Sequence, residues 1–237
     1  MTKITTVIAA GGLGTRLIGY EGNDSTKMLL KIKNSSMICH QINQLINWGL
    51  NDFVIVTNPT YDKLIKEDIV KKFSNINVEF VLQDKQLGVA HALQQAEKVV
   101  PKDSKVLYIL GDNFFEFPQI DKNFLNDIDK NDSYLFSKEV NNPAEFGVVE
   151  IDKQKVISIT EKPKNPKSNL IAVGLYLFPS DCFKKFKYIQ PSHRGEYEIT
   201  SLLEIYMQSN NLKYKKVHGW WIDAGTPEAI KKIEKLI

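Results

Sequence analysis

Cysteine, long apolar runs and blocks of like charge are all scarce in this sequence. Its two cysteines, Cys39 and Cys182, lie in apolar surroundings, so we expect buried free thiols in a reducing compartment rather than a disulfide. The formal net charge of +3 is small and lysines alternate with acids, which argues against nucleic acid as a partner. No apolar run reaches the roughly 18 residues of a membrane span, and no signal-peptide pattern precedes the first predicted strand. We therefore expect a cytoplasmic protein with no membrane partner.

Apolar runs and segments of helical period alternate regularly in the first half of the chain. With 237 residues, 43% hydrophobic and 25% charged, the composition suits one folded α/β domain. Strands are predicted at residues 4–10, 52–58, 78–83 and 105–112, and amphipathic helices at residues 37–50, 61–73 and 89–100. This alternation is typical of a parallel sheet with helices on both faces, whose ligands collect at the carboxyl ends of the strands.

The pattern changes after about residue 133. Runs of β type at residues 133–140, 146–152, 155–163 and 171–178 are joined by turns, so we expect the sheet to gain antiparallel strands. Residues 197–211 are predicted to form a helix, residues 213–225 a strand ending in a turn, and residues 226–237 a helix with Pro227 near its first position. The predicted fold is a Rossmann-like three-layer α/β/α domain with a mixed, mostly parallel central sheet.

A glycine-rich turn follows the first predicted strand. In the stretch AAGGLGTR, Gly11, Gly12 and Gly14 let the backbone approach a charged group closely, with N–H groups turned toward an anion. Arg16 adds a fork of donors that suits phosphate oxygens. The spacing matches neither the Walker loop nor the dinucleotide fingerprint. On its own, the turn is equally compatible with a plain connection between a strand and a helix.

Further motifs follow this turn in a fixed order. They are STKMLL, QDKQLGVAHAL, YILGDN, EFGVVEID, ITEKPKNPKSN, GLYLF, RGEYEIT and WWIDAGTPEAI. In this order they resemble the sugar-1-phosphate nucleotidylyltransferases, most closely the glucose-1-phosphate thymidylyltransferases, over nearly the whole chain. The resemblance implies a nucleotide-diphospho-sugar transferase fold in a single domain, with a nucleotide-binding half at residues 1–115 and an acceptor-binding half at residues 116–237. It also implies Mg²⁺-dependent nucleotide transfer from dTTP or UTP to a sugar 1-phosphate, with glucose 1-phosphate favoured.

The resemblance assigns roles to the residues that match the family's motifs. Arg16 and Lys27 would stabilise charge on the leaving pyrophosphate, and Lys162 would hold the attacking sugar phosphate. The amide of Gln83 suits a pyrimidine edge, and two aspartates at strand ends can share an octahedral Mg²⁺. The expected set is, for the nucleotide, Ala10, Gly11, Gly12, Gly14, Thr15, Gln83 and Gly88; for the acceptor, Gly147, Glu161, Lys162 and Ala172; for catalysis, Arg16, Lys27 and Lys162; for the metal, Asp112 and Asp223.

The chain also departs from the family pattern. Arg16 is followed by LIGYEGNDSTK, which has two extra glycines and lacks the family's proline, so we expect a lid over residues 19–24 that orders on the nucleotide. DAG replaces the usual DTG around Asp223, and the sequence ends in the helix that follows, as in a short form without C-terminal regulatory helices. Arg194 and Glu196 suit a structural brace as well as a substrate contact.

Other functions stay open at this point. A cytidylyltransferase acting on a small phosphate such as phosphocholine would suit the altered first loop, although EFGVVEID and EKPKNPKSN favour a sugar pocket. A non-catalytic nucleotide-sugar sensor would be expected to have lost Arg16, Lys27, Asp112 or Asp223, and all of these are present. The sequence also leaves open a homo-oligomer.

Overall fold

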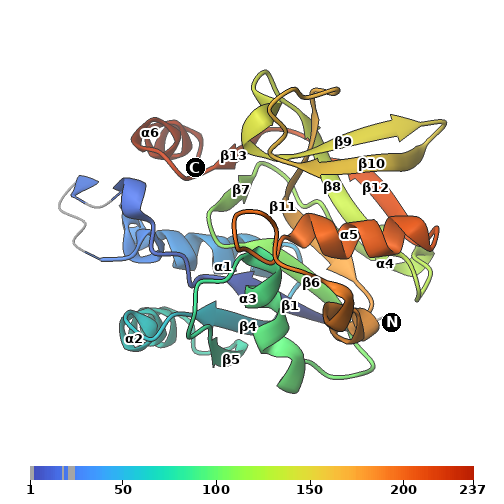
Figure 1. The fold of residues 1–237 in the computed structure, drawn as a ribbon. Helices are drawn as coiled ribbons and strands as arrows, with labels where there is room; N and C mark the ends of the chain where they lie inside the picture. The colour runs from blue at the N-terminus through green and yellow to red at the C-terminus, as the bar shows by residue number, and fades with distance from the viewer. Residues whose placement is uncertain (1–2, 18, 21–24) are drawn as a thin grey trace.

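A mixed sheet of nine strands dominates the computed structural model, which describes residues 3–17, 19–20 and 25–237 (Figure 1). In its parallel half β6 (Lys105–Leu110), β1 (Ile4–Ala9), β4 (Asp52–Thr57) and β5 (Asn77–Leu82) lie in that order, with β5 at the edge of the sheet. These are the four strands predicted for the first half, so the parallel part of the predicted sheet is confirmed. Most of the predicted lid, residues 21–24, lies outside the described residues.

The second half of the chain adds the antiparallel strands. They are β8 (Ser133–Glu139), β9 (Gly147–Asp152), β10 (Lys155–Glu161) and β11 (Leu170–Phe178), with β12 (Leu212–Lys216) parallel to β8. β11 joins the two halves, because its residues Leu175–Phe178 pair with β6 whereas Ile171 and Ala172 pair with β9. β10 forms a hairpin with β9, and β8 pairs with β11. The predicted mixed, mostly parallel sheet is therefore confirmed.

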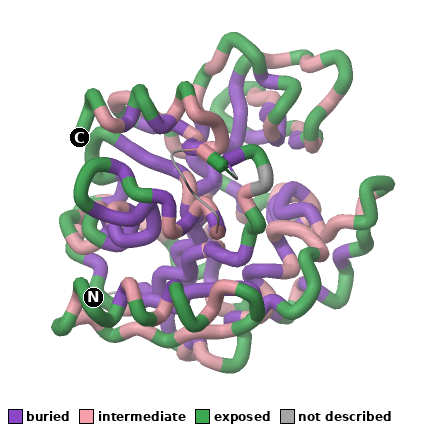
Figure 2. Tube along the Cα trace, turned by 90° about the vertical axis from the view of Figure 1, so that its left-hand side faces the viewer, coloured by how far each residue is buried: buried purple, intermediate pink, exposed green. Residues whose placement is uncertain are grey.

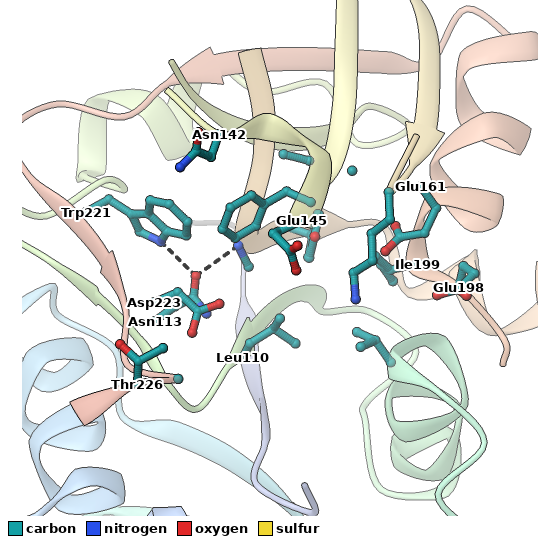
Figure 3. A pocket seen from close by; sticks show the side chains of 18 of the residues that line it. Leu110, Asn113, Asn142, Glu145, Glu161, Glu198, Ile199, Trp221, Asp223 and Thr226 are labelled. Carbon is teal, nitrogen blue, oxygen red and sulfur yellow. Dashed lines mark hydrogen bonds between the residues drawn. The ribbon is translucent and has the colours of Figure 1, made fainter. Parts of the chain in front are cut away.

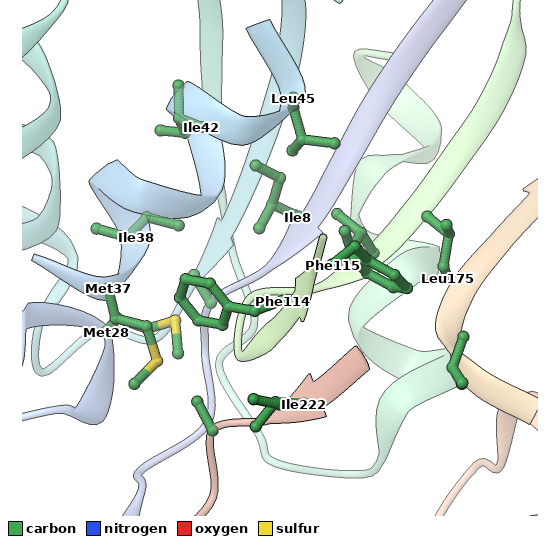
Figure 4. Packing of buried hydrophobic residues seen from close by; sticks show 14 of the residues in the cluster. Ile8, Met28, Met37, Ile38, Ile42, Leu45, Phe114, Phe115, Leu175 and Ile222 are labelled. Carbon is green, nitrogen blue, oxygen red and sulfur yellow. The ribbon is translucent and has the colours of Figure 1, made fainter. Parts of the chain in front are cut away.

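Helices cover both faces of this sheet. They are α1 (Met37–Asn47), α2 (Asp62–Lys72), α3 (Val89–Gln95), α4 (Lys122–Asp127), α5 (Ile199–Gln208) and α6 (Pro227–Leu236). Side chains alternate across a strand, so Ile8 packs in the cluster with α1, α2 and α6, whereas Val7 packs with α3 and α5. Figure 4 shows Ile38, Ile42 and Leu45 of α1 beside Ile8, and Figure 2 shows buried backbone through the middle of the molecule. The predicted three layers are confirmed.

The prediction of one strand over residues 213–225 is wrong. The structure has two, β12 and β13 (Trp221–Asp223), and β13 leaves the large sheet to pair antiparallel with β7 (Asn113–Phe115). The chain turns between them at Gly219, whose φ of +71° is left-handed. The Trp220 N–H there donates to Glu116 Oε2 over 2.8 Å. This turn matters because the register of β13 on β7 places Asp223 opposite Asn113.

The two cysteines agree with the expectation of buried free thiols. Cys39 and Cys182 are both free and buried, and burial raises the pKa of the Cys39 thiol to about 12. Within the described ranges, every helix is too short or too polar to span a bilayer.

Lys105 is a buried cation that ties the start of β6 to a loop. Its side chain is 5% exposed, and its Nζ donates to the backbone carbonyls of Asp129, Lys130 and Asp132 over 2.8, 3.3 and 3.0 Å. Replacing Lys105 by methionine would leave these carbonyls without their donor, so we expect the free energy of unfolding to fall by about 2 kcal/mol. Urea unfolding measures this change. The exposed Lys102→Met serves as control, and equal stability of the two variants would contradict the prediction.

Candidate active site

Three adjoining cavities lie where β1, β6 and β13 end. The glycine-loop cavity, about 250 Å³, is lined by residues that include Gly11, Gly12, Gln83 and Gly88. The central cavity, about 220 Å³, is lined by Gly14, Arg16, Leu17, Lys27, Asp112, Asp223 and Gly225. The β9–β11 cavity, about 370 Å³ and drawn in Figure 3, is lined by residues that include Gly147, Glu161, Lys162 and Ala172. Lys27 and Asp112 are shared by the first two cavities, and Arg16 and Asp223 by the last two.

Two glycines of the first loop, Gly11 and Gly14, are packed closely against other segments of the chain. An added Cβ at Gly11 would lie 3.1 Å from Gln83 Oε1, and the Gly11 carbonyl accepts a hydrogen bond from Asn58 Nδ2 over 2.9 Å. At Gly14 an added Cβ would lie 2.7 Å from both Cβ and Cγ of Lys27, and the φ of this residue is +62°. The loop therefore needs glycine at position 14 for its backbone angle and for the approach of Lys27.

We expect Gly14→Ala to lower the rate of the reaction at this site by about 10²-fold, because the new methyl group would displace Lys27 from the central cavity. The rate of product formation from saturating substrates measures the effect. Gly49→Ala is the matched control, since Gly49 has a φ of +85° but open space around its Cα. A rate unaffected in Gly14→Ala would show that Lys27 need not occupy its observed place.

Ala10 is an expected nucleotide residue that lines none of these three cavities. Ala10 is fully buried, and its N–H donates to the Val56 carbonyl over 2.8 Å. Thr15 begins a short 3₁₀ segment, Thr15–Leu17, that leads from the loop to Arg16. Both residues position the loop backbone between β1 and Arg16.

Gln83 and Gly88 meet on the far side of the glycine-loop cavity. Gln83 follows β5 and is 3% exposed, and its Nε2 donates to the Gly88 carbonyl over 3.1 Å. Gly88 directly precedes α3 with a φ of +107°, and an added Cβ would lie 2.7 Å from the Tyr197 carbonyl oxygen. Only glycine fits this approach, so the start of α3 stays open toward the cavity.

The two aspartates face the central cavity together with two cations. Lys27 Nζ forms an ion pair and hydrogen bond with Asp112 Oδ2. Burial acts to raise the pKa of Asp112, but the charge of Lys27 and the hydrogen bonds from Lys27 and Asn113 together hold that pKa below its ordinary value. Burial, and then the charge of Asp112, raise the pKa of Asp223 to about 7, although Lys27 and Arg16 both act to lower it. The site therefore holds two nearby carboxylates whose repulsion is only partly offset.

A hard divalent cation fits this pair. Carboxylate oxygens are the ligands that Mg²⁺ prefers, and a cation between Asp112 and Asp223 would offset the repulsion that raises the pKa of Asp223. Among the described residues, no group of three or more His, Cys, Asp or Glu side chains could hold a metal ion. Mg²⁺ commonly takes one or two carboxylates and completes its shell with water and phosphate oxygens, so this pair suits a metal that arrives with a phosphate ligand.

Asn113 links the strands that carry the two aspartates, and the sequence analysis did not identify it. Its Oδ1 accepts hydrogen bonds from Trp221 Nε1 over 2.7 Å and from the Gly174 N–H over 3.1 Å (Figure 3). Its Nδ2 donates to Asp112 Oδ1 over 2.9 Å. The Asn113 side chain is 1% exposed, so this network is shielded from water. The network fixes the orientation of Asp112 relative to β13, on which Asp223 lies.

The β9–β11 cavity contains the four expected acceptor residues. Gly147 stands opposite Glu161 in the β9–β10 hairpin, and an added Cβ at Gly147 would lie 3.5 Å from Glu161 Oε2 and 4.0 Å from Ala172 Cβ. Burial, and then the charge of Glu198, raise the pKa of Glu161. Lys162 has a left-handed φ of 42°, and its N–H donates to the Phe146 carbonyl over 3.0 Å. This strained turn directs the chain after β10 along the cavity rim.

Several lining residues were not predicted. In Figure 3, Trp221 and Asn113 lie on one side of the β9–β11 cavity, and Glu161 and Glu198 lie on the other. Arg194 pairs with Glu196 at 2.7 Å and with Glu198 at 3.1 Å, and these two glutamates line different cavities. The motif RGEYEIT contained the signal for Glu198. Asn142 and Glu145 also line the cavity. Glu145 is the first residue of the motif EFGVVEID, whereas Asn142 lies before that motif.

The chain is similar in sequence to known proteins over most of its length. A family model described as Nucleotidyl transferase matches residues 5–237. The chain is 35% identical to the Bifunctional protein GlmU of Methanococcus aeolicus, over 93% of this chain and 51% of that protein. It is 31% identical to a glucose-1-phosphate thymidylyltransferase of Neisseria meningitidis, over 98% and 81% of the two chains. It is 30% identical to the UTP-glucose-1-phosphate uridylyltransferase AglF of Haloferax volcanii, over 94% and 91%.

The chain thus spans about half the length of the first of these relatives. A crystal structure from Bacillus anthracis, assigned as a glucose-1-phosphate thymidylyltransferase and containing sucrose, superposes with a TM-score of 0.87. Its sequence is 33% identical, and the match covers 98% of this chain and 94% of that one. The similarity therefore extends over the whole sheet and all three cavities.

Proposed function

The chain belongs to the nucleotidyl transferase family, and from that premise we propose that it couples a nucleoside triphosphate to a sugar 1-phosphate, with release of pyrophosphate. The observation that supports this proposal most is that the three cavities adjoin one another. The glycine-loop cavity would hold the nucleoside and the β9–β11 cavity the sugar phosphate. The central cavity between them contains Arg16, Lys27, Asp112 and Asp223, where the reacting phosphates would meet.

The proposed reaction is a displacement at the α-phosphorus of the nucleotide. An oxygen of the sugar 1-phosphate forms a bond to this phosphorus, and the bond to pyrophosphate breaks with its electron pair leaving on the pyrophosphate. Because the attacking phosphate is already anionic at neutral pH, the residues need to overcome repulsion between anions rather than remove a proton. Lys162 would hold the attacking phosphate, and Arg16 and Lys27 would stabilise the leaving group.

Asp112 and Asp223 are the residues that would hold Mg²⁺. When bound, the ion would supply positive charge beside the phosphate oxygens as their charge shifts toward pyrophosphate. Asn113 would keep the Asp112 carboxylate turned toward the central cavity through its hydrogen bond.

The substrates that we propose are dTTP or UTP and glucose 1-phosphate. Two of the relatives are, by their names, a glucose-1-phosphate thymidylyltransferase and a UTP-glucose-1-phosphate uridylyltransferase. Gly147 and Glu161 line the β9–β11 cavity, where the Glu161 carboxylate and the backbone at Gly147 would form hydrogen bonds with sugar hydroxyls. A neutral sugar with several hydroxyls would satisfy these polar groups.

A pyrophosphate-release screen tests the proposal. The purified protein with Mg²⁺ would be given ATP, GTP, CTP, UTP and dTTP, each with glucose 1-phosphate, its amino-sugar relatives and phosphocholine. We expect the highest turnover with dTTP or UTP and glucose 1-phosphate. Turnover with CTP and phosphocholine alone would replace the proposal by a cytidylyltransferase. No turnover with any pair would favour a nucleotide-sugar sensor.

A further inference from the structure

Two residues form a wall between the glycine-loop cavity and the β9–β11 cavity. Val89, the first residue of α3, and Leu110, the last residue of β6, line both cavities. A ligand in either cavity would therefore contact the same two side chains from its own side. The position of this shared wall decides how much room each ligand has, and whether both ligands can be bound at once.

Tyr108 ties the two parts of the shared wall together. It lies two residues before Leu110 on β6, so the two side chains are on the same face of the strand. Its hydroxyl donates a hydrogen bond to the Val89 carbonyl over 2.7 Å. A second bond, from the Ala90 N–H to the Tyr197 carbonyl over 2.9 Å, ties the same turn to the segment before α5. The start of α3 is thus fixed to β6 by one side chain, that of Tyr108.

The Tyr108 side chain is placed to keep this bond. It is fully buried, and its ring stacks on Tyr176 with centroids 6.2 Å apart. Tyr176 lines the β9–β11 cavity, whereas Tyr108 lines none of the three cavities. Burial raises the pKa of the Tyr108 hydroxyl, so the group stays protonated and can donate. Water cannot reach this buried pair to replace either group.

The shared wall separates two ligands that repel each other. The nucleotide and the sugar 1-phosphate would both bring negative charge into the central cavity, which joins their sites. A wall that moved would let the first ligand spread into the second cavity, and the second ligand would then have to reverse that movement in order to bind. A wall fixed by Tyr108 keeps both cavities at their observed volumes, about 250 and 370 Å³.

We propose that Tyr108 is a positioning residue that fixes the shared wall, so that the nucleotide and the sugar 1-phosphate can be bound together. The proposal rests on the proposed function, since it takes the two cavities as the sites of the two substrates. It adds to that function a residue that acts through Val89 and touches neither substrate. Binding of one ligand alone is then nearly independent of Tyr108, whereas binding of the second ligand depends on it.

The test removes only the hydroxyl group. In Tyr108→Phe the ring can still stack on Tyr176, but the Val89 carbonyl loses this donor. Calorimetry with Mg²⁺ would measure the binding of glucose 1-phosphate and of a UTP analogue with a CH₂ group between the α and β phosphorus atoms, which cannot react.

We expect each ligand alone to bind Tyr108→Phe within about twofold of the wild-type dissociation constant. Glucose 1-phosphate should bind about tenfold more weakly to the variant saturated with the analogue than to the wild type saturated with the analogue. Wild-type affinity in that complex would overturn the proposal. The same weakening for each ligand alone would indicate a merely structural role and would also overturn it.

Tyr206→Phe is the matched control. Tyr206 is also buried, its ring stacks on Phe178, and its hydroxyl donates to Asp181 Oδ1 over 3.1 Å, away from the three cavities. Both variants lose one buried hydroxyl, so we expect similar falls in the thermal midpoint of unfolding. Only Tyr108→Phe should weaken binding of the second ligand. If Tyr206→Phe weakens it equally, the cause is a general loosening of the fold and the proposal is overturned.

The two proposals fail in different ways. If the wild type binds both ligands together but releases no pyrophosphate with any pair, the proposed reaction fails, and weaker joint binding in Tyr108→Phe still supports the inference. If pyrophosphate is released but Tyr108→Phe binds both ligands together as the wild type does, the inference fails and the reaction stands.

Discussion

Asp112→Asn is expected to lower the rate of pyrophosphate release by about 10³-fold. The substitution keeps the shape of the side chain and its hydrogen bond to Asn113 but removes the negative charge that faces the central cavity. Without that charge the pair with Asp223 can no longer hold a divalent cation tightly. Steady-state release of pyrophosphate at saturating nucleotide and sugar phosphate measures the loss.

A stability measurement has to accompany this rate. Asp112 is buried against Lys27, and removing one partner of such a pair leaves the other charge less well compensated. Asp223 also faces Lys27, so part of the compensation is kept. Asp103→Asn is the control, since Asp103 is exposed and precedes the same strand that Asp112 follows. If the Asp112→Asn protein is folded and keeps the wild-type rate, Asp112 has no role in the reaction.

The parts of the fold that could be predicted from the sequence are those that depend on local pattern. Three strands of the first half, β1, β4 and β6, are runs of apolar residues, because each is buried on both faces. The start of α6 was predicted with Pro227 near its first position, and the structure has Pro227 in the first turn, after Thr226 as the cap. These features follow from neighbouring residues alone.

The parts that were missed depend on contacts between distant segments. The strand predicted at residues 213–225 was split because Gly219 turns against Glu116, about a hundred positions earlier in the chain. The role of Asn113 depends on Trp221 and Gly174, which join it only when β7, β11 and β13 meet. Tyr108 was read as one residue of a strand, and its hydrogen bond to Val89 depends on how α3 packs beside β6. Pattern in one segment does not encode such pairings.

Candidate site residues could be named from the sequence because they lie in motifs, whereas contacts between distant segments could not. The glycine loop, Lys27, Asp112 and Asp223 were taken from separate motifs, and the structure brings members of all of them to one cavity. What the motifs could not supply is the orientation of each side chain. The Gln83 amide is an example, because its Oε1 faces Gly11 only through the contacts of its Nε2.

Lys162→Gln is expected to lower kcat/KM for the sugar 1-phosphate by about 10²-fold and to leave the dissociation constant of the nucleotide unchanged. Lys162 lines the β9–β11 cavity with Glu161 but is absent from the lining of the glycine-loop cavity. Its ammonium is the charge that would hold the attacking phosphate near the α-phosphorus. Glutamine keeps a polar side chain of similar length and removes that charge.

The control for this prediction shares the unusual backbone of Lys162. Lys153 has a left-handed φ of 44°, is exposed, and lies in the turn before β10, whereas Lys162 directly follows that strand. Lys153→Gln therefore imposes the same change of residue in the same backbone conformation, away from the three cavities. A loss confined to Lys162→Gln would attribute the effect to charge in the acceptor cavity. An equal loss in both variants, or none in Lys162→Gln, would place the attacking phosphate elsewhere.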